Sequence, residues 1–219
     1  SKMYISLEPC SHYGKTSPCT KKIIKNKISE VIYSIDDIDK KVKGKSFKIL
    51  KSNNIKVKKG LLEKEINNFY IPYFYNRLNK LPYVTGKIAT SNNNLIYSTK
   101  VKRITDKYSE KFTHFLRYKN DSIMISYKTL NKDNPRLNCR LEGLKKFSPK
   151  RIVLDNNLNT RTDSFIFDTA NKENTIIFYN KADKKKIILF KKKGIQLIKS
   201  NLNKKGYFNL RLVLMKLFK

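Results

Sequence analysis

Two cysteines, Cys10 and Cys19, bracket a short polar loop whose residue types suit metal or anion binding. Each cysteine follows a proline, and the loop comes directly after the apolar run 3–7, which predicts a buried strand. Cys19 opens the amphipathic run 19–25, and Pro18 stands where a helix N-terminus tolerates proline. The positive end of a helix dipole there would lower the pKa of the Cys19 thiol and favour metal binding. We therefore interpret the loop as half of a zinc site, and two reduced structural thiols or a disulfide are the alternatives.

The residues around these cysteines strengthen the interpretation. From residue 8 to residue 19 they read Glu-Pro-Cys-Ser-His-Tyr-Gly-Lys-Thr-Ser-Pro-Cys. This segment resembles the second zinc motif of the riboflavin-biosynthesis pyrimidine deaminases, which belong to the cytidine-deaminase-like zinc enzymes. The resemblance implies that Cys10 and Cys19 are zinc ligands. It also implies that three residues of the loop face the ribose phosphate of the substrate: His12, Lys15 and Thr16.

One part of the family's zinc site is absent from this sequence. The third ligand and the general acid/base come from a His-x-Glu segment upstream of the cysteines, and the sequence contains no such segment. The other histidine, His114, lies far downstream in a different context. The sequence starts at Ser1 inside a predicted strand and stops at Lys219 inside an amphipathic run, so we expect a piece truncated at both ends. Deaminase chemistry is accordingly expected of a longer parent protein.

The charge of the chain is strongly basic. Its 49 Lys and Arg residues and 17 Asp and Glu residues give a net charge of +32, which by itself would suggest nucleic acid or an anionic membrane as partner. The lysines, however, are spread along the whole chain beside abundant Asn and Ile, as AT-rich coding would produce, and only eight of the basic residues are arginine. We expect no specific nucleic-acid partner. With no apolar run of membrane-spanning length and three cysteines, we expect a cytoplasmic enzyme and leave a homo-oligomer open.

Hydrophobic periodicity predicts an α/β chain of two domains. In the first, strands 3–7, 31–35 and 55–57 alternate with helices that start near residues 18, 44 and 61. Asn79-Lys80-Leu81-Pro82 interrupts this pattern, so we place the domains at 1–80 and 81–219. In the second domain the expected strands are 83–89, 122–125, 151–154, 174–179 and 195–198, and the expected helices are 105–118, 127–131 and 181–193.

The second half resembles the reductase domain that is fused to these deaminases. The matching segments are Leu81-Pro82-Tyr83-Val84, Lys87-Ile88-Ala89, Ile104-Thr105, Leu116-Arg117, Thr129-Leu130-x-x-Asp133-Asn134-Pro135-x-Leu137-Asn138-x-Arg140 and Arg151-Ile152-Val153-Leu154-Asp155. The resemblance implies a partial cytidine-deaminase-like α/β/α domain followed by a dihydrofolate-reductase-like α/β domain that uses NADPH. One departure is Asn92-Asn93-Asn94, where the family usually has an Asp-Gly turn.

The resemblance also implies roles for individual residues. Arg117 and Arg140 bind the substrate phosphate, which suits the planar fork of a guanidinium. Leu137 and the backbone near Val101 complete that pocket, and Lys87 is the catalytic candidate that contacts the reacting substrate. The residues that meet NADPH are Ala89, Arg103, Thr129, Asp133 and Asn156. A structural alternative is that Thr129 and Asp133 simply begin and end a helical turn.

The function implied for the parent protein has two steps. It would deaminate 2,5-diamino-6-ribosylamino-pyrimidinone 5′-phosphate at Zn²⁺ and then reduce the ribosyl group of the product to ribityl with NADPH. Two other classes stay open: a nucleic-acid or nucleotide deaminase, which the charge favours, and a degenerate protein that binds pyrimidine nucleotides without turnover.

Overall fold

The computed structural model describes residues 1–96 and 105–218. The chain divides into two compact units, one built on Ser1–Val84 and the other on Thr85–Lys216. This division lies four residues beyond the boundary that the sequence pattern suggested. Within the described ranges, no helix combines the length and the apolar composition needed to cross a membrane.

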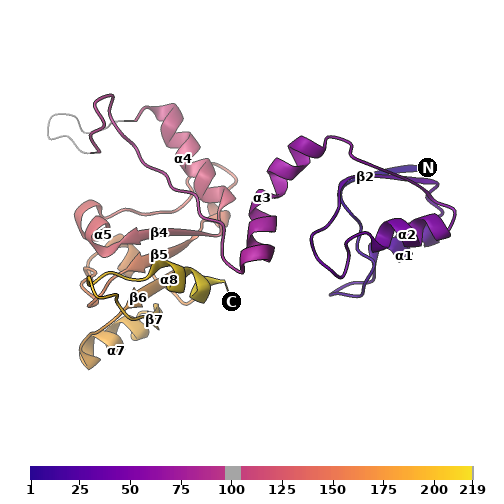
Figure 1. Ribbon diagram of the computed structural model, residues 1–219. Helices are drawn as coiled ribbons and strands as arrows, with labels where there is room; N and C mark the ends of the chain where they lie inside the picture. Colours follow the sequence, from indigo (N-terminus) through magenta and orange to yellow (C-terminus); the bar gives the residue numbers. More distant parts are fainter. Residues whose placement is uncertain (97–104, 219) are drawn as a thin grey trace. The chain divides into compact units, whose positions relative to one another are not determined.

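The first unit holds a parallel three-stranded sheet in the order β1-β2-β3 (Figure 1). Each strand is followed by a helix, as the sequence pattern predicted, and the predicted strand ends shift by at most two residues. The elements are β1 (Lys2–Leu7), α1 (Cys19–Lys25), β2 (Glu30–Ile35), α2 (Lys45–Ser52), β3 (Lys56–Lys59) and α3 (Glu63–Asn79).

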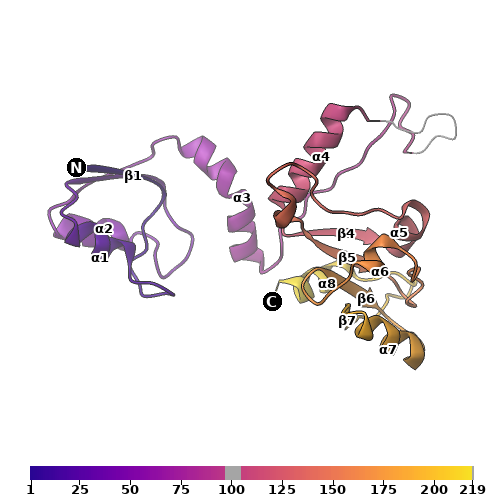
Figure 2. The ribbon, with the colours of Figure 1, turned by 180° about the vertical axis from the view of Figure 1, so that it is seen from behind.

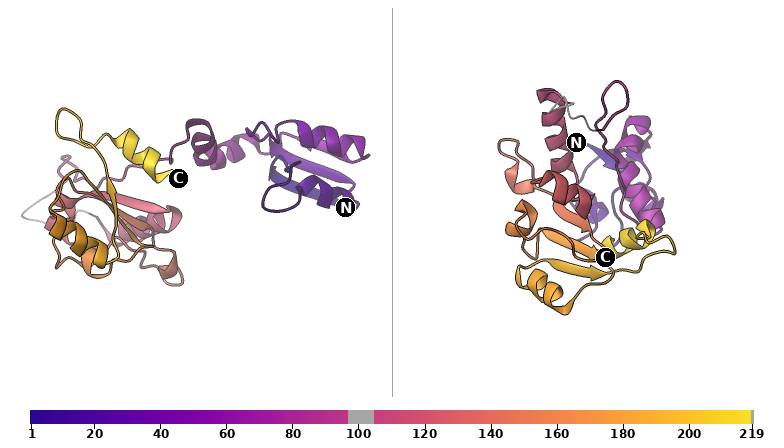
Figure 3. Two further views of the ribbon diagram at one scale, coloured as in Figure 1. Left: turned by 90° about the horizontal axis from the view of Figure 1, so that it is seen from below. Right: turned by 90° about the vertical axis from the view of Figure 1, so that its left-hand side faces the viewer.

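Helices contact both faces of this sheet. Ile23 of α1 and Leu50 of α2 pack against Val31 of β2 in one buried cluster, so α1 and α2 lie on the same face (Figure 3). Side chains alternate along a strand, and the register pairs Met3 with Val31, so Ser6 points to the opposite face. The Ser6 hydroxyl lies 3.0 Å from the hydroxyl of Tyr70 on α3. The unit is therefore layered as helix, sheet and helix.

The second unit holds a parallel four-stranded sheet in the order β4-β5-β6-β7, seen from both sides in Figures 1 and 2. The sequence pattern predicted its strands and long helices within a few residues, but it missed α6 and the short 3-10 helix η1. The elements are α4 (Lys107–Lys119), β4 (Ser122–Ser126), α5 (Tyr127–Asp133), η1 (Lys145–Phe147), β5 (Lys150–Leu154), α6 (Phe165–Asp168), β6 (Thr175–Tyr179), α7 (Lys184–Lys192), β7 (Gln196–Lys199) and α8 (Leu210–Leu217).

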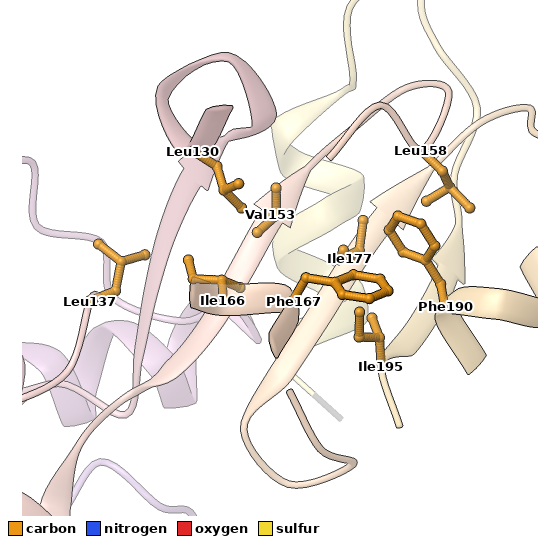
Figure 4. Close-up of a cluster of buried hydrophobic side chains, with 9 residues drawn as sticks. All are labelled: Leu130, Leu137, Val153, Leu158, Ile166, Phe167, Ile177, Phe190 and Ile195. Carbon is orange, nitrogen blue, oxygen red and sulfur yellow. The ribbon is translucent and has the colours of Figure 1, made fainter. Parts of the chain in front are cut away.

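A buried apolar cluster packs α5, α6 and α7 against the central strands β5 and β6 (Figure 4). The two central strands are buried along most of their length, which explains why they appear in the sequence as nearly continuous apolar runs. The rings of Phe167 and Phe190 meet edge to face with centroids 5.0 Å apart. The cluster comprises Leu130, Leu137, Val153, Leu158, Ile166, Phe167, Ile177, Phe190 and Ile195.

The strand predicted at residues 83–89 is absent, so that prediction was wrong. Residues 82–91 have no regular secondary structure, and Val84 and Ile88 are 61% and 73% exposed. A strand is stable only when a neighbour satisfies its backbone N–H and C=O groups. None of the strands in the described ranges pairs with this segment. The segment contains apolar residues, but no described strand pairs with it.

The buried cluster of the second unit gives a direct test of the fold. Ile177 lies in the middle of this cluster, whereas Ile188 on α7 is exposed. Ile177→Ala should lower the free energy of unfolding by about 2–5 kcal/mol, because it opens a cavity among fixed neighbours. Ile188→Ala is the matched control and should change it by less than about 0.5 kcal/mol. Urea denaturation measures both, and equal effects of the two variants would contradict the packing described.

Candidate functional site

The loop between β1 and α1 brings Cys10 and Cys19 together. The backbone N–H of Cys19 donates to Sγ of Cys10 over 3.2 Å, and the N–H of Thr20 donates to the Cys10 carbonyl over 3.2 Å. Both thiols are free, so no disulfide joins them. The structure thus places the two predicted ligands side by side at the start of α1.

The buried carboxylate of Glu8 fixes the start of this loop. Glu8 is 3% exposed and accepts hydrogen bonds from the backbone N–H groups of Asp37, Gly44 and Ser46 at 3.3, 3.0 and 3.1 Å. The Ser46 hydroxyl also donates to the carbonyl of Pro9. Gly44 is the N-cap of α2 and has no side chain that could cap the helix, so Glu8, the residue after β1, serves that purpose. These bonds connect the residues before Cys10 to the N-terminus of α2.

The environment of Cys19 corrects one expectation. Burial, and after it the hydrogen bond with the Cys10 side chain, raises the pKa of the Cys19 thiol above its usual value. The predicted lowering by the helix dipole was wrong. Burial and the neighbouring Cys10 thiol outweigh the effects that lower this pKa, which are a backbone hydrogen bond with Cys10 and the charge of Lys22.

The residues of this loop do not complete a zinc site by themselves. Within residues 1–96 and 105–218, no group of three or more His, Cys, Asp or Glu side chains is arranged to hold a metal ion. Zinc takes four ligands, three of them from the protein in catalytic sites. Nδ1 of His12 is buried without a hydrogen-bond partner among the described atoms, while Lys15 and Thr16 are exposed on the loop.

In the second unit, the carboxyl ends of the parallel strands meet at one edge of the sheet. β4 ends at Ser126, whose hydroxyl caps α5 by accepting from the N–H of Thr129 over 3.2 Å. The loop after the neighbouring strand β5 is attached to α5, because the side chain of Asn131 donates to the carbonyl of Asn159 over 2.8 Å. Ligands of parallel α/β sheets bind outside this edge. The predicted cofactor residues on α5 and on the loop at Asn156 therefore lie on adjacent segments of one edge.

Local structure also uses these residues. Thr129 is the third residue of α5, and its hydroxyl lies 3.2 Å from that of Ser126. Asp133 is the last residue of α5, before Asn134 in the left-handed region at φ 41°. The side chain of Asn156 donates to the Gly206 carbonyl over 3.3 Å. Asp133 ends α5, as the structural alternative expected, whereas Thr129 does not begin it. Contact of either residue with a cofactor stays a prediction.

Asp155 organises the loop that carries Asn156. Its buried carboxylate accepts from the N–H groups of Asn159 and Thr160 at 2.8 and 2.6 Å, and from the Thr160 hydroxyl at 2.7 Å. Sequence reasoning matched Asp155 to the family strand but gave it no role. Its signal was a carboxylate directly after a buried strand, followed by a run of asparagines.

Arg117 and Arg140 meet around His114, which sequence reasoning set aside. Nη1 of Arg117 donates to the Asn138 carbonyl over 3.2 Å and lies 3.3 Å from Nδ1 of His114. The backbone N–H of Arg140 donates to the same Nδ1 over 3.2 Å. Nη2 of Arg140 lies 3.6 Å from Oε1 of Glu110, and both side chains of this pair are exposed. The structure therefore brings together both predicted phosphate ligands.

Burial shapes the electrostatics of this cluster. Burial, and after it the charge of Arg140, lowers the pKa of the Arg117 guanidinium. Burial also lowers the pKa of His114, and the charges of Arg117 and Arg140 add to this effect. Nε of Arg117 is buried without a hydrogen-bond partner among the described atoms. Two guanidinium groups, with Glu110 as the nearby carboxylate, leave this partly dehydrated site with a net positive charge, which suits an anion.

The remaining predicted site residues lie in the apolar cluster, in the irregular segment 82–91 or outside the described residues. Leu137 is 5% exposed within the apolar cluster and has φ 55°, a rare conformation for leucine, so only its backbone is available to a ligand. Lys87 is exposed and Ala89 half-buried in the irregular segment 82–91, and no hydrogen bond or ion pair between described residues joins Lys87 to the arginines. Val101 and Arg103 lie outside the described residues.

Comparison with known protein families matches residues 84–219 to the RibD C-terminal domain. The chain belongs to this family. It is 34% identical over 223 residues to the riboflavin biosynthesis protein RibD of Aquifex aeolicus, covering 98% of this chain and 59% of that protein. Identity to RibD of Actinobacillus pleuropneumoniae is 32% over 197 residues, covering 89% of this chain and 52% of the relative. The chain thus spans little more than half the length of these relatives.

Solved structures agree with this assignment. The crystal structure of a diaminohydroxyphosphoribosylaminopyrimidine deaminase/5-amino-6-(5-phosphoribosylamino)uracil reductase from Thermotoga maritima superposes with a TM-score of 0.79 at 26% identity, covering 98% of this chain and 58% of that one. The resemblance to the riboflavin-biosynthesis family is therefore confirmed, as is the dihydrofolate-reductase-like fold of the second half. The cytidine-deaminase-like assignment of the first half stays a prediction.

The thiol pair makes zinc binding testable. The chain should bind Zn²⁺ weakly, because two thiolates fill only half of a tetrahedral site, whereas complete structural sites reach about 10–16 kcal/mol of apparent binding free energy. Competition with a coloured chelator measures this affinity. The double variant Cys10→Ser with Cys19→Ser should lose the binding, and Cys139→Ser, which changes the third cysteine, should keep it. Tight stoichiometric zinc in the double variant would refute the assignment.

The lowered pKa of His114 predicts a pH dependence of stability. The folded chain keeps His114 neutral below the usual imidazole pKa of about 6.5, while the unfolded chain takes up the proton. The free energy of unfolding should therefore fall as the pH is lowered from about 7 to about 5. Arg117, Arg140 and Glu110 are the charged groups that face the ring. Urea denaturation across this range should show a smaller loss in His114→Asn, with His12→Asn as the control variant, and an unchanged loss in His114→Asn would refute this origin.

Proposed function

We propose that the second unit is the NADPH-dependent reductase domain of a bifunctional riboflavin-biosynthesis protein. The parent protein would deaminate a phosphoribosylated diaminopyrimidine and then reduce its ribosyl group to ribityl. The observation that carries the proposal is the pair Arg117 and Arg140, held together in a domain that matches the RibD C-terminal family. The phosphoribosylated pyrimidine is the proposed partner, and no specific nucleic acid is proposed.

The arginine pair would hold the phosphate of the substrate. The Arg140 guanidinium is exposed, and its pairing with Glu110 at 3.6 Å is of the weak surface kind that a phosphate can displace. Arg117 is more buried and is anchored through Nη1, so it supplies charge from a fixed position. Guanidinium groups bind phosphate through paired N–H donors. This arrangement would fix one end of the substrate and leave the sugar carbon free to reach the cofactor.

The carboxyl edge of the sheet would hold NADPH. It offers hydroxyl and amide groups on α5 and on the loop after β5, which are the donors and acceptors that a dinucleotide needs. NADPH, when bound, supplies a hydride to C1 of the opened ribose or its imine. Thr129, Asp133 and Asn156, together with Ala89 and Arg103, would bind and orient the cofactor. Lys87 would contact the reacting end of the substrate.

The deaminase half of the proposal concerns the parent protein. Cys10 and Cys19 would be two of the zinc ligands, and His12, Lys15 and Thr16 would contact the ribose phosphate. The described residues supply neither a third ligand nor a glutamate acid/base beside the thiols. The second candidate is a protein that binds pyrimidine nucleotides without turnover, which absence of the His-x-Glu segment from the intact parent gene would favour. Deamination by the parent protein, measured as ammonia release, separates the two.

The proposal divides the two ligands between Arg140, which would bind the substrate phosphate, and Asp133, which would bind NADPH. This division can be tested in the parent protein. Arg140→Ala should lower kcat/KM for the reduction by about 10- to 150-fold, because hydrogen bonds to charged groups contribute about 1.5–3 kcal/mol. Arg140→Lys should recover part of this loss, since a point charge cannot reproduce the fork. Asp133→Ala should weaken NADPH more than the substrate. Steady-state kinetics with each substrate varied in turn measures these effects.

Two outcomes would contradict this division. One is an unchanged reduction in Arg140→Ala. The other is damage to NADPH binding alone in both variants. Deamination serves as the internal control, because Arg140 and Asp133 lie in the second unit and the predicted zinc ligands lie in the first.

A further inference from the structure

We propose that His114 is a positioning residue of the phosphate site, whose neutral ring holds Arg117 and Arg140 in place. The inference rests on the proposed function, in which these two arginines bind the substrate phosphate. It adds a residue that is not itself a ligand of the phosphate. It also fixes the protonation state and the tautomer of that residue.

The geometry joins a helix to a distant loop. His114 and Arg117 are three residues apart on α4, so both side chains lie on one face of the helix. Nδ1 of His114 accepts from the N–H of Arg140, and Nη1 of Arg117 donates to the Asn138 carbonyl, each over 3.2 Å. The helix thus holds residues 138–140 through the Asn138 carbonyl and the Arg140 N–H, on either side of Cys139. Arg140 cannot change its backbone position without breaking the bond to His114.

The same contacts settle the tautomer. A backbone N–H only donates, so Nδ1 of His114 must carry its lone pair, and the proton lies on Nε2. The contact with Nη1 of Arg117, at 3.3 Å, is then also a donation to Nδ1. His114 is 6% exposed, and of the three charged groups that face its ring, Arg117 and Arg140 are positive and Glu110 is negative. Protonation would turn the shared acceptor into a donor and break both contacts.

A neutral acceptor has a specific advantage at this position. A carboxylate at residue 114 could hold the same two donors, but it would cancel one positive charge and compete with the phosphate. The imidazole orients the arginine-bearing segments and leaves their charge intact for a dianion. Neighbouring like charges cost free energy in the empty site, which a bound phosphate returns. The buried Nε of Arg117, which has no partner among the described atoms, is consistent with a site built for a ligand.

Three variants test the positioning role in the full chain, with inorganic phosphate and ribose 5-phosphate as probes in titration calorimetry. His114→Phe keeps the ring volume but removes the acceptor, and it should weaken both probes by about tenfold or more. His114→Asn keeps an acceptor near the position of Nδ1 and should stay within about threefold of the original chain. Arg140→Ala should weaken both probes and serves as the test of the proposed function itself.

The outcomes separate the two claims. If Arg140→Ala leaves phosphate binding unchanged, the proposed phosphate site fails. If Arg140→Ala weakens binding while folded His114→Phe does not, or if His114→Asn is as damaging as His114→Phe, the positioning role is overturned. In the parent protein, His114→Phe should raise KM for the substrate and leave KM for NADPH unchanged.

The tautomer gives a readout that does not depend on a variant that folds poorly. The chain contains two histidines, so ring-nitrogen NMR with His12→Asn for assignment identifies the His114 signals. At pH 7 these should show a protonated Nε2 and a bare Nδ1. A proton on Nδ1, or a charged ring at that pH, would overturn the inference.

Discussion

The parallel arrangement of the strands is the constraint on which the second unit depends. Parallel pairing requires a crossover after each strand, and it delivers the carboxyl ends of β4, β5, β6 and β7 to one edge. The polar groups that follow those strands are therefore neighbours without being close in sequence. Ser126 caps α5 there, and Asp155 folds the next loop around its carboxylate. The apolar cluster beneath these loops gives them a fixed base (Figure 4).

Buried and partly buried charged groups have different kinds of partner in this chain. Glu8 and Asp155 are satisfied by backbone N–H groups, so each carboxylate organises a loop and is not free to act on a ligand. Arg151 is also buried and donates to Thr169 and Thr175, which locks two strands to α6. Arg117 differs because another arginine and a histidine lie beside it, with Glu110 as the nearby acidic side chain. Positive charge in a partly dehydrated site is costly, and the proposed phosphate would offset that cost.

Sequence reasoning found what local patterns encode. Apolar runs located the strands of both sheets, and the Thr129-to-Arg140 segment located the region of the arginine cluster. It could not find His114, because the contact with Arg140 joins residues 26 positions apart and has no local signature. The prediction of a strand at 83–89 was wrong because the sequence of one segment does not show whether a neighbouring strand will pair with it. The prediction of a lowered pKa for Cys19 was wrong because it considered only the helix dipole. It left out burial and the Cys10 thiol, whose position depends on the folded loop.

The central claim is that the arginine cluster recognises the phosphate of a substrate that the neighbouring sheet edge reduces. The most direct measurement is the rate of NADPH oxidation by the parent protein with the deaminated phosphoribosylamino-pyrimidine and with the same compound lacking its phosphate. The account predicts turnover of the phosphorylated compound. For the compound without phosphate it predicts a kcat/KM at least about tenfold lower, which corresponds to the loss of roughly one hydrogen bond to a charged group. Equal turnover of the two compounds, or no oxidation of NADPH with either, would contradict it.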